Sequence, residues 1–294
     1  MDAFHTFWSK PNRLRHGGRV AAEDCEVLTM ILSALKWQEK NGAVRMVTDR
    51  AGAAFFKSLS LENLWSAPID ESLEDMDESV DAELFWAAGK LEALRRVSAP
   101  CVMLDTDLIV WQPLSEKLGG NVVAAHREPL NPTVYPDPRR AFGMARDYAF
   151  PTQWDFSLLP VNTAFLYMPD DAIRRAYTDA AFRFMAALRR GAGAVATMCF
   201  AEQRILPMCA AASGAQVDTL LREDALDGQE LATHLWGAKR TFAADVRAGT
   251  AYCVRCALRI ERDFPRWGAA LAANDRFGMY FAPPSARNGE EGSL

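Results

Sequence analysis

The stretch Cys101-Val102-Met103-Leu104-Asp105-Thr106-Asp107-Leu108-Ile109-Val110 places two aspartates between two apolar runs. The first run predicts a buried strand over residues 100–105. Residues i and i+2 of an extended chain point to the same face, so we expect Asp105 and Asp107 to present two negative charges to one spot. Such a pair is costly in apolar surroundings unless a positive charge compensates it, and a divalent cation suits carboxylate oxygens. The alternative is a solvated turn in which the aspartates cap local backbone groups.

Strands and helices alternate along the chain before this stretch. The expected segments are a strand at His5–Trp8, a helix over 22–40, a strand at Val44–Val47, a short helix with Phe55, Phe56 and Leu59, a candidate strand in 63–69, an acidic solvated loop over Asp70–Asp81 and a helix over 82–97. The alternation predicts an α/β fold with a parallel sheet and helices on both faces. Ligands of such sheets bind beyond the carboxyl ends of the strands, which here are Trp8-Ser9, Thr48-Asp49 and Asp105–Asp107.

The second half of the chain is organised differently. The expected segments are a strand over 122–126, a long loop over 127–155, a strand over 163–168, helices over 170–190 and 194–212, a strand over 216–221, and terminal helices over 251–263 and 266–273. The sequence contains neither an internal repeat nor a clear linker. We therefore predict one domain over residues 1–282, followed by a flexible tail over 283–294.

Composition argues against several classes of protein. The formal net charge of −5 disfavours general nucleic-acid binding, and no apolar run is long enough for a membrane span. The N-terminus does not have the pattern of a signal peptide, so we expect the six cysteines to be reduced thiols in the cytoplasm. The pair Cys253 and Cys256 lacks the second close pair that a four-thiolate zinc site needs.

Several polar residues beside apolar runs are candidates for a ligand site. Lys90 lies four residues from Trp86 and Leu94 on the predicted helix, so its amine either snorkels to water or is aimed at phosphate or carboxylate near the strand ends. His234 could supply a metal ligand and Lys239 could meet phosphate, although an isolated histidine is more often structural. The remaining candidates are Asn162, Glu202, Gln203 and Trp236, for which turn, helix-surface or core positions are the alternatives.

Taken together, these residues resemble the motifs of the GT-A glycosyltransferases. The block from Lys90 to Val110 is similar to their helix, strand and Asp-x-Asp segment, and Pro160-Val161-Asn162-Thr163-Ala164 resembles their Phe-Asn-Ser-Gly strand entry. Ala201-Glu202-Gln203 resembles their Asp-Gln helix segment, and His234-x-x-Gly237 with Lys239 resembles His-x-x-Gly-x-x-Lys. The matches follow the family's order over roughly residues 80–240. The chain looks closest to the retaining branch, with its glycogenin-like, lipopolysaccharide galactosyltransferase-like and capsular sugar transferase-like members, and its N-terminus suggests an uncharacterised bacterial branch.

The sequence also departs from the family pattern. Thr163-Ala164 stands where Ser-Gly is usual, Glu202 replaces an aspartate, and Lys239 comes one residue early. The first strand lacks the usual nucleotide-binding signature, so Phe7-Trp8-Ser9 would have to serve.

The resemblance implies a GT-A Rossmann-like, mostly parallel sheet flanked by helices, with helical C-terminal additions. The nucleotide-binding half would be residues 1–110, and the acceptor and donor-sugar half residues 111–282. The implied activity is transfer of a sugar from a nucleotide-diphosphate sugar to an acceptor hydroxyl on a glycan, a lipid-linked compound or a small molecule, with retention. The implied metal ligands for Mn²⁺ or Mg²⁺ are Asp105, Asp107 and His234. The implied donor-binding residues are Trp8, Ser9, Asp49, Lys90, Trp236, Gly237 and Lys239, and the implied catalytic residues are Asn162, Glu202 and Gln203.

Two other functions stay open at this point. The departures at Thr163-Ala164 and Lys239 are compatible with a nucleotide-sugar binding protein that has lost transfer. A metal-dependent nucleotidyltransferase also uses paired carboxylates on an α/β sheet, and Arg13-Leu14-Arg15-His16-Gly17-Gly18-Arg19 partly imitates its Gly-rich basic loop.

Overall fold

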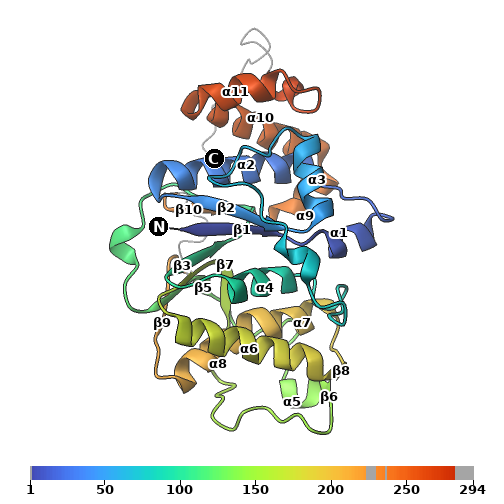
Figure 1. Ribbon diagram of the computed structural model, residues 1–294, viewed down its shortest axis with the longest axis vertical. Coiled ribbons are helices and arrows are strands. Elements are labelled where there is room, and N and C mark those ends of the chain that lie inside the picture. Colours follow the sequence, from blue (N-terminus) through green and yellow to red (C-terminus); the bar gives the residue numbers. More distant parts are fainter. Residues whose placement is uncertain (1, 223–229, 236, 282–294) are drawn as a thin grey trace. The chain divides into compact units, whose positions relative to one another are not determined.

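The computed structural model describes residues 2–222, 230–235 and 237–281, apart from the side chain of Ala243 (Figure 1). The chain divides into two compact units, each built from several segments. Unit 1 comprises Met1–Ala21, Asn41–Asp105 and Leu114–Asp227, and unit 2 comprises Ala22–Lys40, Thr106–Pro113 and Gly228–Leu294. The single domain expected over residues 1–282 stays a prediction, and the tail expected over 283–294 lies outside the described residues.

Unit 1 is built on a six-stranded sheet in the order β2-β1-β3-β7-β5-β9. Its strands are β1 (Ala3–Phe7), β2 (Val44–Thr48), β3 (Cys101–Leu104), β5 (Val122–Arg127), β7 (Val161–Met168) and β9 (Val217–Thr219). Strand β7 is antiparallel to both of its neighbours, and every other pairing is parallel. The predicted mixed α/β fold with a mostly parallel sheet is therefore confirmed.

Helices cover both faces of this sheet. The helices of unit 1 are α1 (Ser9–Arg15), α3 (Arg50–Ser58), α4 (Ala88–Arg96), α5 (Pro138–Ala141), α6 (Asp171–Ala187), α7 (Ala194–Cys199) and α8 (Ile205–Ala212), with 3₁₀ turns at Ser72–Asp75 and Ser115–Lys117 and a π-helix at Phe200–Arg204. A small ribbon pairs β6 (Gly143–Met144) with β8 (Leu188–Arg190).

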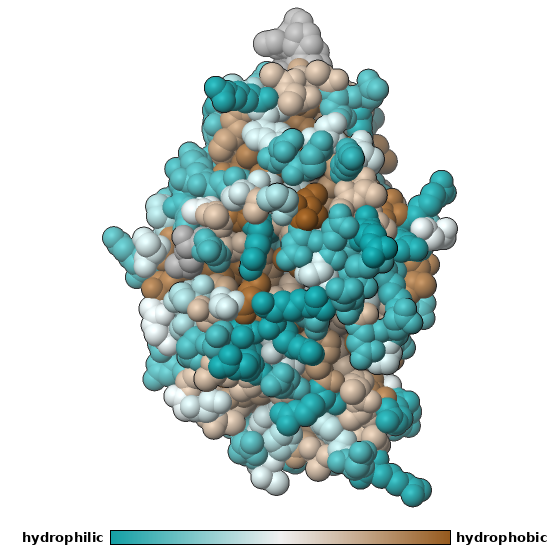
Figure 2. All heavy atoms as spheres, in the orientation of Figure 1, coloured by the Kyte–Doolittle hydropathy of each residue, from teal (hydrophilic) through white to brown (hydrophobic). Residues whose placement is uncertain are grey.

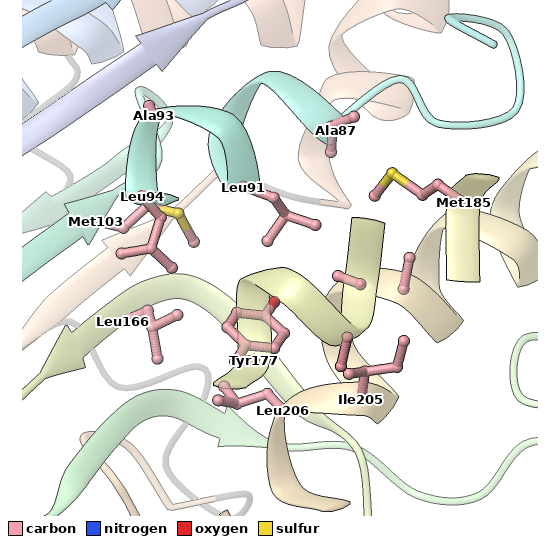
Figure 3. Close-up of a cluster of buried hydrophobic side chains, with 14 of the residues drawn as sticks. Ala87, Leu91, Ala93, Leu94, Met103, Leu166, Tyr177, Met185, Ile205 and Leu206 are labelled. Carbon is pink, nitrogen blue, oxygen red and sulfur yellow. The ribbon is translucent and has the colours of Figure 1, made fainter. Parts of the chain in front are cut away.

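Alternation along β1 sends its side chains into two different layers. Phe4 belongs to a buried cluster with residues of α4 and α6, and Figure 3 shows Leu91 and Tyr177 within that cluster. Phe7 faces the opposite way and contacts Phe56 of α3 at a ring-centroid distance of 5.4 Å. Strand β1 therefore contributes apolar side chains to the layers on both faces of the sheet. On the face of the molecule shown in Figure 2, hydrophilic side chains predominate and apolar ones are scattered.

Unit 2 is mainly helical. It contains α2 (Asp24–Lys40), α9 (Ala238–Ala244), α10 (Val246–Asp263), α11 (Pro265–Ala272), a 3₁₀ turn at Gly278–Phe281, and an antiparallel ribbon of β4 (Leu108–Val110) with β10 (Ala232–His234). The Ser33 hydroxyl of α2 donates to the Leu108 carbonyl, and the hydroxyls of Thr29 and Tyr252 join α2 to α10. None of the described helices combines the length and the apolar character that crossing a bilayer requires.

Several predicted segments are confirmed with small shifts at their ends. The helix expected over 22–40 is α2, the strands expected at 44–47, 100–105, 122–126 and 163–168 are β2, β3, β5 and β7, and the helical region over 194–212 contains α7, the π-helix and α8. The first strand begins at Ala3 and the strand expected over 216–221 is β9. The terminal helices are α10, which begins at Val246, and α11.

Other predicted segments were wrong. The helix expected over 82–97 begins only at Ala88, because the Asp81 side chain accepts hydrogen bonds from Glu83 and Leu84 and holds a turn there. Residues 63–69 form no strand, and only Asp70 makes an isolated bridge to Val47.

The loops also hold more structure than expected. The acidic segment 70–81 contains a 3₁₀ turn with Leu73 buried, the loop over 127–155 contains α5 and β6, and the helix expected to reach 190 ends at Ala187 before β8.

Candidate functional site

The Asp105-Thr106-Asp107 stretch is a turn and not a continuation of the strand. Strand β3 ends at Leu104, the backbone N–H of Asp105 donates to the Ala164 carbonyl, and β4 begins at Leu108. The expectation that the backbone stays extended through Asp107 was therefore wrong. Each carboxylate has a cationic protein partner within its own unit, which supplies positive charge beside it.

Asp105 of unit 1 is paired with Lys90. The Lys90 ammonium lies 2.6 Å from Asp105 Oδ1 and 2.5 Å from Glu202 Oε1, and only 14% of the Lys90 side chain is exposed. Burial opposes the charged form of Lys90, but the two carboxylates outweigh it and raise the pKa of the amine. The Lys90 amine is thus directed at carboxylates near the end of β3. Of the two interpretations of Lys90 from the sequence, this one agrees with the structure, and snorkelling to water does not. Trp86, exposed and outside α4, does not share a buried stripe with it.

Glu202 is the most buried carboxylate of this group. It lies in the π-helix Phe200–Arg204, where its carbonyl accepts a hydrogen bond of 2.5 Å from the Tyr177 hydroxyl. Its Oε1 atom accepts from both Lys90 and the Thr163 hydroxyl, at 2.5 and 2.6 Å. Within the part of the chain that the structure describes, Oε2 has no hydrogen-bond partner. π-Helical turns are frequent at functional sites, and this one fixes a carboxylate with one oxygen held and the other available.

The neighbouring candidates Asn162 and Gln203 are both engaged by protein groups. Asn162 Oδ1 accepts from the backbone N–H of Ala164, and its Nδ2 donates to Glu128 at 3.3 Å. Gln203 accepts a hydrogen bond from the hydroxyl of Tyr135. The sequence did not indicate that Tyr135, Thr163 and Tyr177 form hydrogen bonds with Gln203 or Glu202. Thr163 was noted only as a departure from a motif, and the two tyrosines carry no local signal.

Asp107 of unit 2 is paired with His234 and Lys239. His234 is opposite Leu108 in the β4–β10 ribbon, and the N–H of Leu235 donates to the Asp107 carbonyl. His234 Nε2 lies 3.4 Å from Asp107 Oδ1, and Lys239 Nζ lies 2.7 Å from Asp107 Oδ2. Burial disfavours the ionised carboxyl, but the hydrogen bonds and charges of His234 and Lys239 outweigh it and hold the pKa of Asp107 well below its usual range. Gly237 precedes α9, and Trp236 lies outside the described residues.

The donor-site candidates at the ends of β1 and β2 lie close together. Asp49 Oδ2 accepts from the backbone N–H and the hydroxyl of Ser9, and Asp49 Oδ1 caps α3 through the N–H of Gly52. Trp8 and Asp49 line a pocket of about 510 Å³, together with Lys10 and Arg13. Ser9 is fully buried and does not line it.

This pocket lies where the strand order favours ligand binding. Strand β1 lies between β2 and β3, so the chain moves to one side of β1 for β2 and to the other side for β3. Such a switch opens a crevice beyond the carboxyl ends of the strands. Trp8 is held there by close packing, because a Cβ atom added to Gly89 would lie 2.5 Å from the Trp8 Cβ.

The donor set fits a hard divalent cation. Asp107 and His234 offer ligand atoms within 4.8 Å of each other, and only Thr106 separates Asp107 from Asp105. Two peptide units limit the distance between the Cα atoms of the two aspartates to about 7 Å. Carboxylate oxygens with one imidazole nitrogen suit Mn²⁺, and oxygen ligands suit Mg²⁺.

The sequence can now be placed among known proteins. Residues 1–234 match the pattern that defines DUF6734, a family of unknown function. The chain belongs to the DUF6734 family. The matched region of this DUF6734 member holds all of the candidate residues up to His234, whereas Trp236, Gly237 and Lys239 follow it. No curated protein matches the sequence.

Three solved structures are similar to this DUF6734 member at low identity. The glycosyltransferase GlyE of Streptococcus pneumoniae TIGR4 is 12% identical with a TM-score of 0.35, over 75% of this chain and 45% of GlyE. Mouse xyloside xylosyltransferase 1 in its apo form is 14% identical with a TM-score of 0.38, over 75% of this chain and 85% of that protein. An active-site mutant of LgtC is 11% identical with a TM-score of 0.35, over 74% of this chain and 72% of LgtC. The DUF6734 chain thus spans less than half the length of GlyE.

Proposed function

We propose that the chain is a metal-dependent glycosyltransferase that moves a sugar from a nucleotide-diphosphate sugar to an acceptor hydroxyl, with retention. One observation carries the proposal. Lys90, Asp105, Thr163 and Glu202 come from three motifs that are far apart in the sequence, yet they form one hydrogen-bonded group at the carboxyl end of β3. These are the motifs on which the resemblance to GT-A glycosyltransferases rests.

Asp105, Asp107 and His234 are the residues that would hold Mn²⁺ or Mg²⁺. When bound, the cation would offset the negative charge that develops on the diphosphate as the glycosidic bond breaks. Lys239 contributes a second positive charge beside Asp107, and its side chain is 38% exposed, so it can reach a phosphate oxygen. Lys90 provides positive charge beside Asp105 and Glu202 and orients both carboxylates.

The pocket beyond β1 and β2 is the proposed nucleoside site. Trp8 and Asp49 line this pocket, and the Ser9 hydroxyl donates to the Asp49 carboxylate and orients it. Glu202 presents its available Oε2 atom toward the donor sugar in this proposal, and Asn162 and Gln203 support the same region. Gly237 and Trp236 complete the proposed donor contacts. The proposed compartment is the cytoplasm, since all six cysteines are free thiols.

A second candidate function is nucleotidyl transfer. Lys10 and Arg13 line the same pocket as Trp8, so a basic N-terminal segment is available for a triphosphate. That class of enzyme uses paired carboxylates with a metal in the same way, and competition between ligands separates the two functions.

The test is a thermal-shift screen of nucleotide sugars with and without Mn²⁺. A ligand at about one hundred times its Kd stabilises a protein by about 2.7 kcal/mol, so a correct donor gives a clear, metal-dependent shift. Asp107→Ala is expected to abolish the shift, whereas Asp179→Ala, an exposed aspartate on α6, keeps it. An unchanged shift in Asp107→Ala contradicts the metal assignment.

The same screen separates the alternatives. A nucleoside triphosphate that outcompetes every nucleotide sugar favours nucleotidyl transfer. A metal-dependent shift without any hydrolysis or transfer of the donor sugar favours a protein that only binds nucleotide sugars.

A further inference from the structure

A second pocket lies within unit 2, beside the ion pair of Asp107 with Lys239. It has a volume of about 370 Å³, which is within the range of small-molecule sites, and α2, α9, α10 and the 3₁₀ turn at Gly278–Phe281 enclose it. Its lining includes Glu23, Glu26, Lys239, Phe242, Val246 and Tyr280.

Lys239 links this pocket to the Asp107 pair. Its ammonium lies 2.7 Å from Asp107 Oδ2 and 3.4 Å from Glu26 Oε1, and both Lys239 and Glu26 line the pocket. A molecule bound in the pocket would therefore meet the same lysine that contacts Asp107. This places the polar end of the pocket next to a residue of the proposed metal site.

The other side of the pocket is apolar. Val246 is 76% exposed and lines the pocket, and Met279, which precedes the lining residue Tyr280, is 68% exposed. These are the two most exposed large apolar side chains among the described residues. Of the two, Val246 lines the pocket and offers exposed apolar surface to a ligand bound there.

Packing and a hydroxyl contact hold the aromatic wall of the pocket in place. The Phe242 ring packs on Tyr252 with centroids 4.8 Å apart, and Tyr252 is tied to Thr29 by a hydroxyl contact of 2.9 Å. Burial raises the pKa of the Cys253 thiol to about 12, so this wall stays uncharged at neutral pH. The pocket thus combines fixed aromatic and apolar surface with carboxylates that accept hydrogen bonds from hydroxyl groups.

We infer that this pocket holds the acceptor of the proposed transfer, and that the acceptor is an amphiphile with a hydroxyl-rich, non-anionic head and an apolar tail. This inference rests on the proposed function. The carboxylates of Glu23 and Glu26 match hydroxyl donors, and the Lys239 ammonium in the same lining is already paired with Asp107 and Glu26, so the lining favours a non-anionic head. Phe242 and Val246 match a hydrocarbon tail. In the transfer, the acceptor oxygen bonds to the anomeric carbon, the bond from that carbon to the diphosphate oxygen breaks, and the hydroxyl proton leaves with the departing nucleoside diphosphate.

The probes for this site are n-octyl β-D-glucopyranoside below its micelle concentration, glucose, and n-octyl phosphate, each titrated calorimetrically without donor or metal. We expect the glucoside to bind more tightly than glucose and than octyl phosphate. Val246→Asp should weaken glucoside binding about tenfold, because it replaces apolar contact with a charge. Val195→Asp is the matched control, since Val195 is 52% exposed at the start of α7 in unit 1, and it should bind the glucoside as the unaltered protein does.

Equal affinities for Val246→Asp and Val195→Asp, or equal binding of octyl phosphate and octyl glucoside, would overturn the inference. Phe242→Ala is an independent test, and we expect it to weaken glucoside binding about tenfold as well. Mn²⁺-dependent stabilisation by nucleotide sugars, measured on the same protein, keeps the two proposals apart. If nucleotide sugars stabilise the protein but the glucoside does not bind, the acceptor-pocket assignment is wrong and the proposed function is unaffected. Glucoside binding without any metal-dependent nucleotide binding contradicts the proposed function, and with it the acceptor role.

Discussion

The ammonium of Lys90 on α4 lies 2.6 Å from Oδ1 of Asp105 at the end of β3. The same ammonium lies 2.5 Å from Glu202, whose side chain is only 3% exposed. One positive charge therefore compensates two carboxylates, and the group keeps a net negative charge. A site with this charge attracts a cation, and it depends on Lys90 for its integrity.

Replacing Lys90 with methionine should destabilise the protein strongly. Removing one partner of a buried ion pair typically costs about 3–5 kcal/mol, because the remaining charge stays buried without compensation. Chemical denaturation measures the loss. The double variant Lys90→Met/Glu202→Gln should recover part of it, because the most buried carboxylate is then neutral. Lys40→Met, which removes a lysine that is 34% exposed and 3.3 Å from Glu39, is the control and should change stability by less than about 1 kcal/mol.

Gly89→Ala should disturb Trp8 and the pocket beyond β1. The added methyl group would lie 2.5 Å from the Trp8 Cβ, a contact that forces the helix or the ring to shift. Overpacking of this kind costs about 1–3 kcal/mol. We expect a lower melting temperature, altered tryptophan fluorescence and weaker nucleotide binding. Gly119→Ala is the comparison, because a Cβ atom there meets nothing within 4 Å. Equal behaviour of the two variants would argue against the packing of Trp8 on α4.

Tyr177→Phe tests the π-helix that carries Glu202. The Tyr177 hydroxyl donates to the Glu202 carbonyl at 2.5 Å, and Tyr177 is fully buried. Loss of the hydroxyl leaves a buried carbonyl without this donor, at a cost of about 1–3 kcal/mol in the free energy of unfolding. Tyr167→Phe removes a hydroxyl that donates to the Gly119 carbonyl at 3.1 Å in a less buried setting, and its cost should be smaller. A larger loss in Tyr167→Phe would contradict this account.

Asp263 should give unit 2 a defined pH dependence. The Asp263 carboxylate lies 2.5 Å from Lys36, whose side chain is 5% exposed, and 2.6 Å from Arg259. Partial burial opposes ionisation, but Arg262, Lys36 and Arg259 outweigh it and hold the pKa of Asp263 well below its usual range. A depressed carboxyl pKa stabilises the folded state above the unfolded pKa of about 3.9, and the contribution is lost as pH falls toward the folded pKa.

The expected measurement follows from that sign. Asp263→Asn should lower the free energy of unfolding by about 2 kcal/mol, between the values for exposed and buried pairs. The difference from the unaltered protein should be constant from pH 8 to about pH 5 and should shrink below about pH 4. A difference that grows on acidification would contradict the assignment.

Much of the fold follows from local pattern. Helix α2 shows a helical repeat of apolar residues, and β3 and β7 are short apolar runs that the sheet buries on both faces, so sequence alone predicts them. The sequence did not predict the start of α4 correctly. Residues 82–87 fit the helical pattern, but the turn held by the Asp81 side chain keeps them out of the helix. The π-helix has no local signal, since it is held by Tyr177, which lies on another helix.

The candidate site was predicted in part. Spacing alone marked Asp105 and Asp107 as charged residues that need compensation, and the structure supplies Lys90 to one and Lys239 to the other. The extended geometry behind the prediction was wrong, because the backbone N–H of Asp105 bonds across to Ala164 and a turn follows. The roles of Asn162, Gln203, Ser9 and Asp49 stay predictions. Each of these side chains forms a hydrogen bond to another protein group, and the sequence alone did not predict those partners.

The order of segments in unit 2 matters while the protein is being made. Strand β4 pairs with β10, and α2 packs with α10, so two early segments depend on partners that follow much later in the sequence. Translation adds about 5–20 residues per second, so Leu108, Ile109 and Val110 lack their partner strand β10 on the nascent chain for several seconds. Unit 2 can therefore complete its fold only after α10 has been synthesised. The yield of folded protein should therefore depend on chaperones that shield this apolar stretch and on the rate of translation. This dependence should be stronger than for a protein whose paired segments are adjacent in sequence.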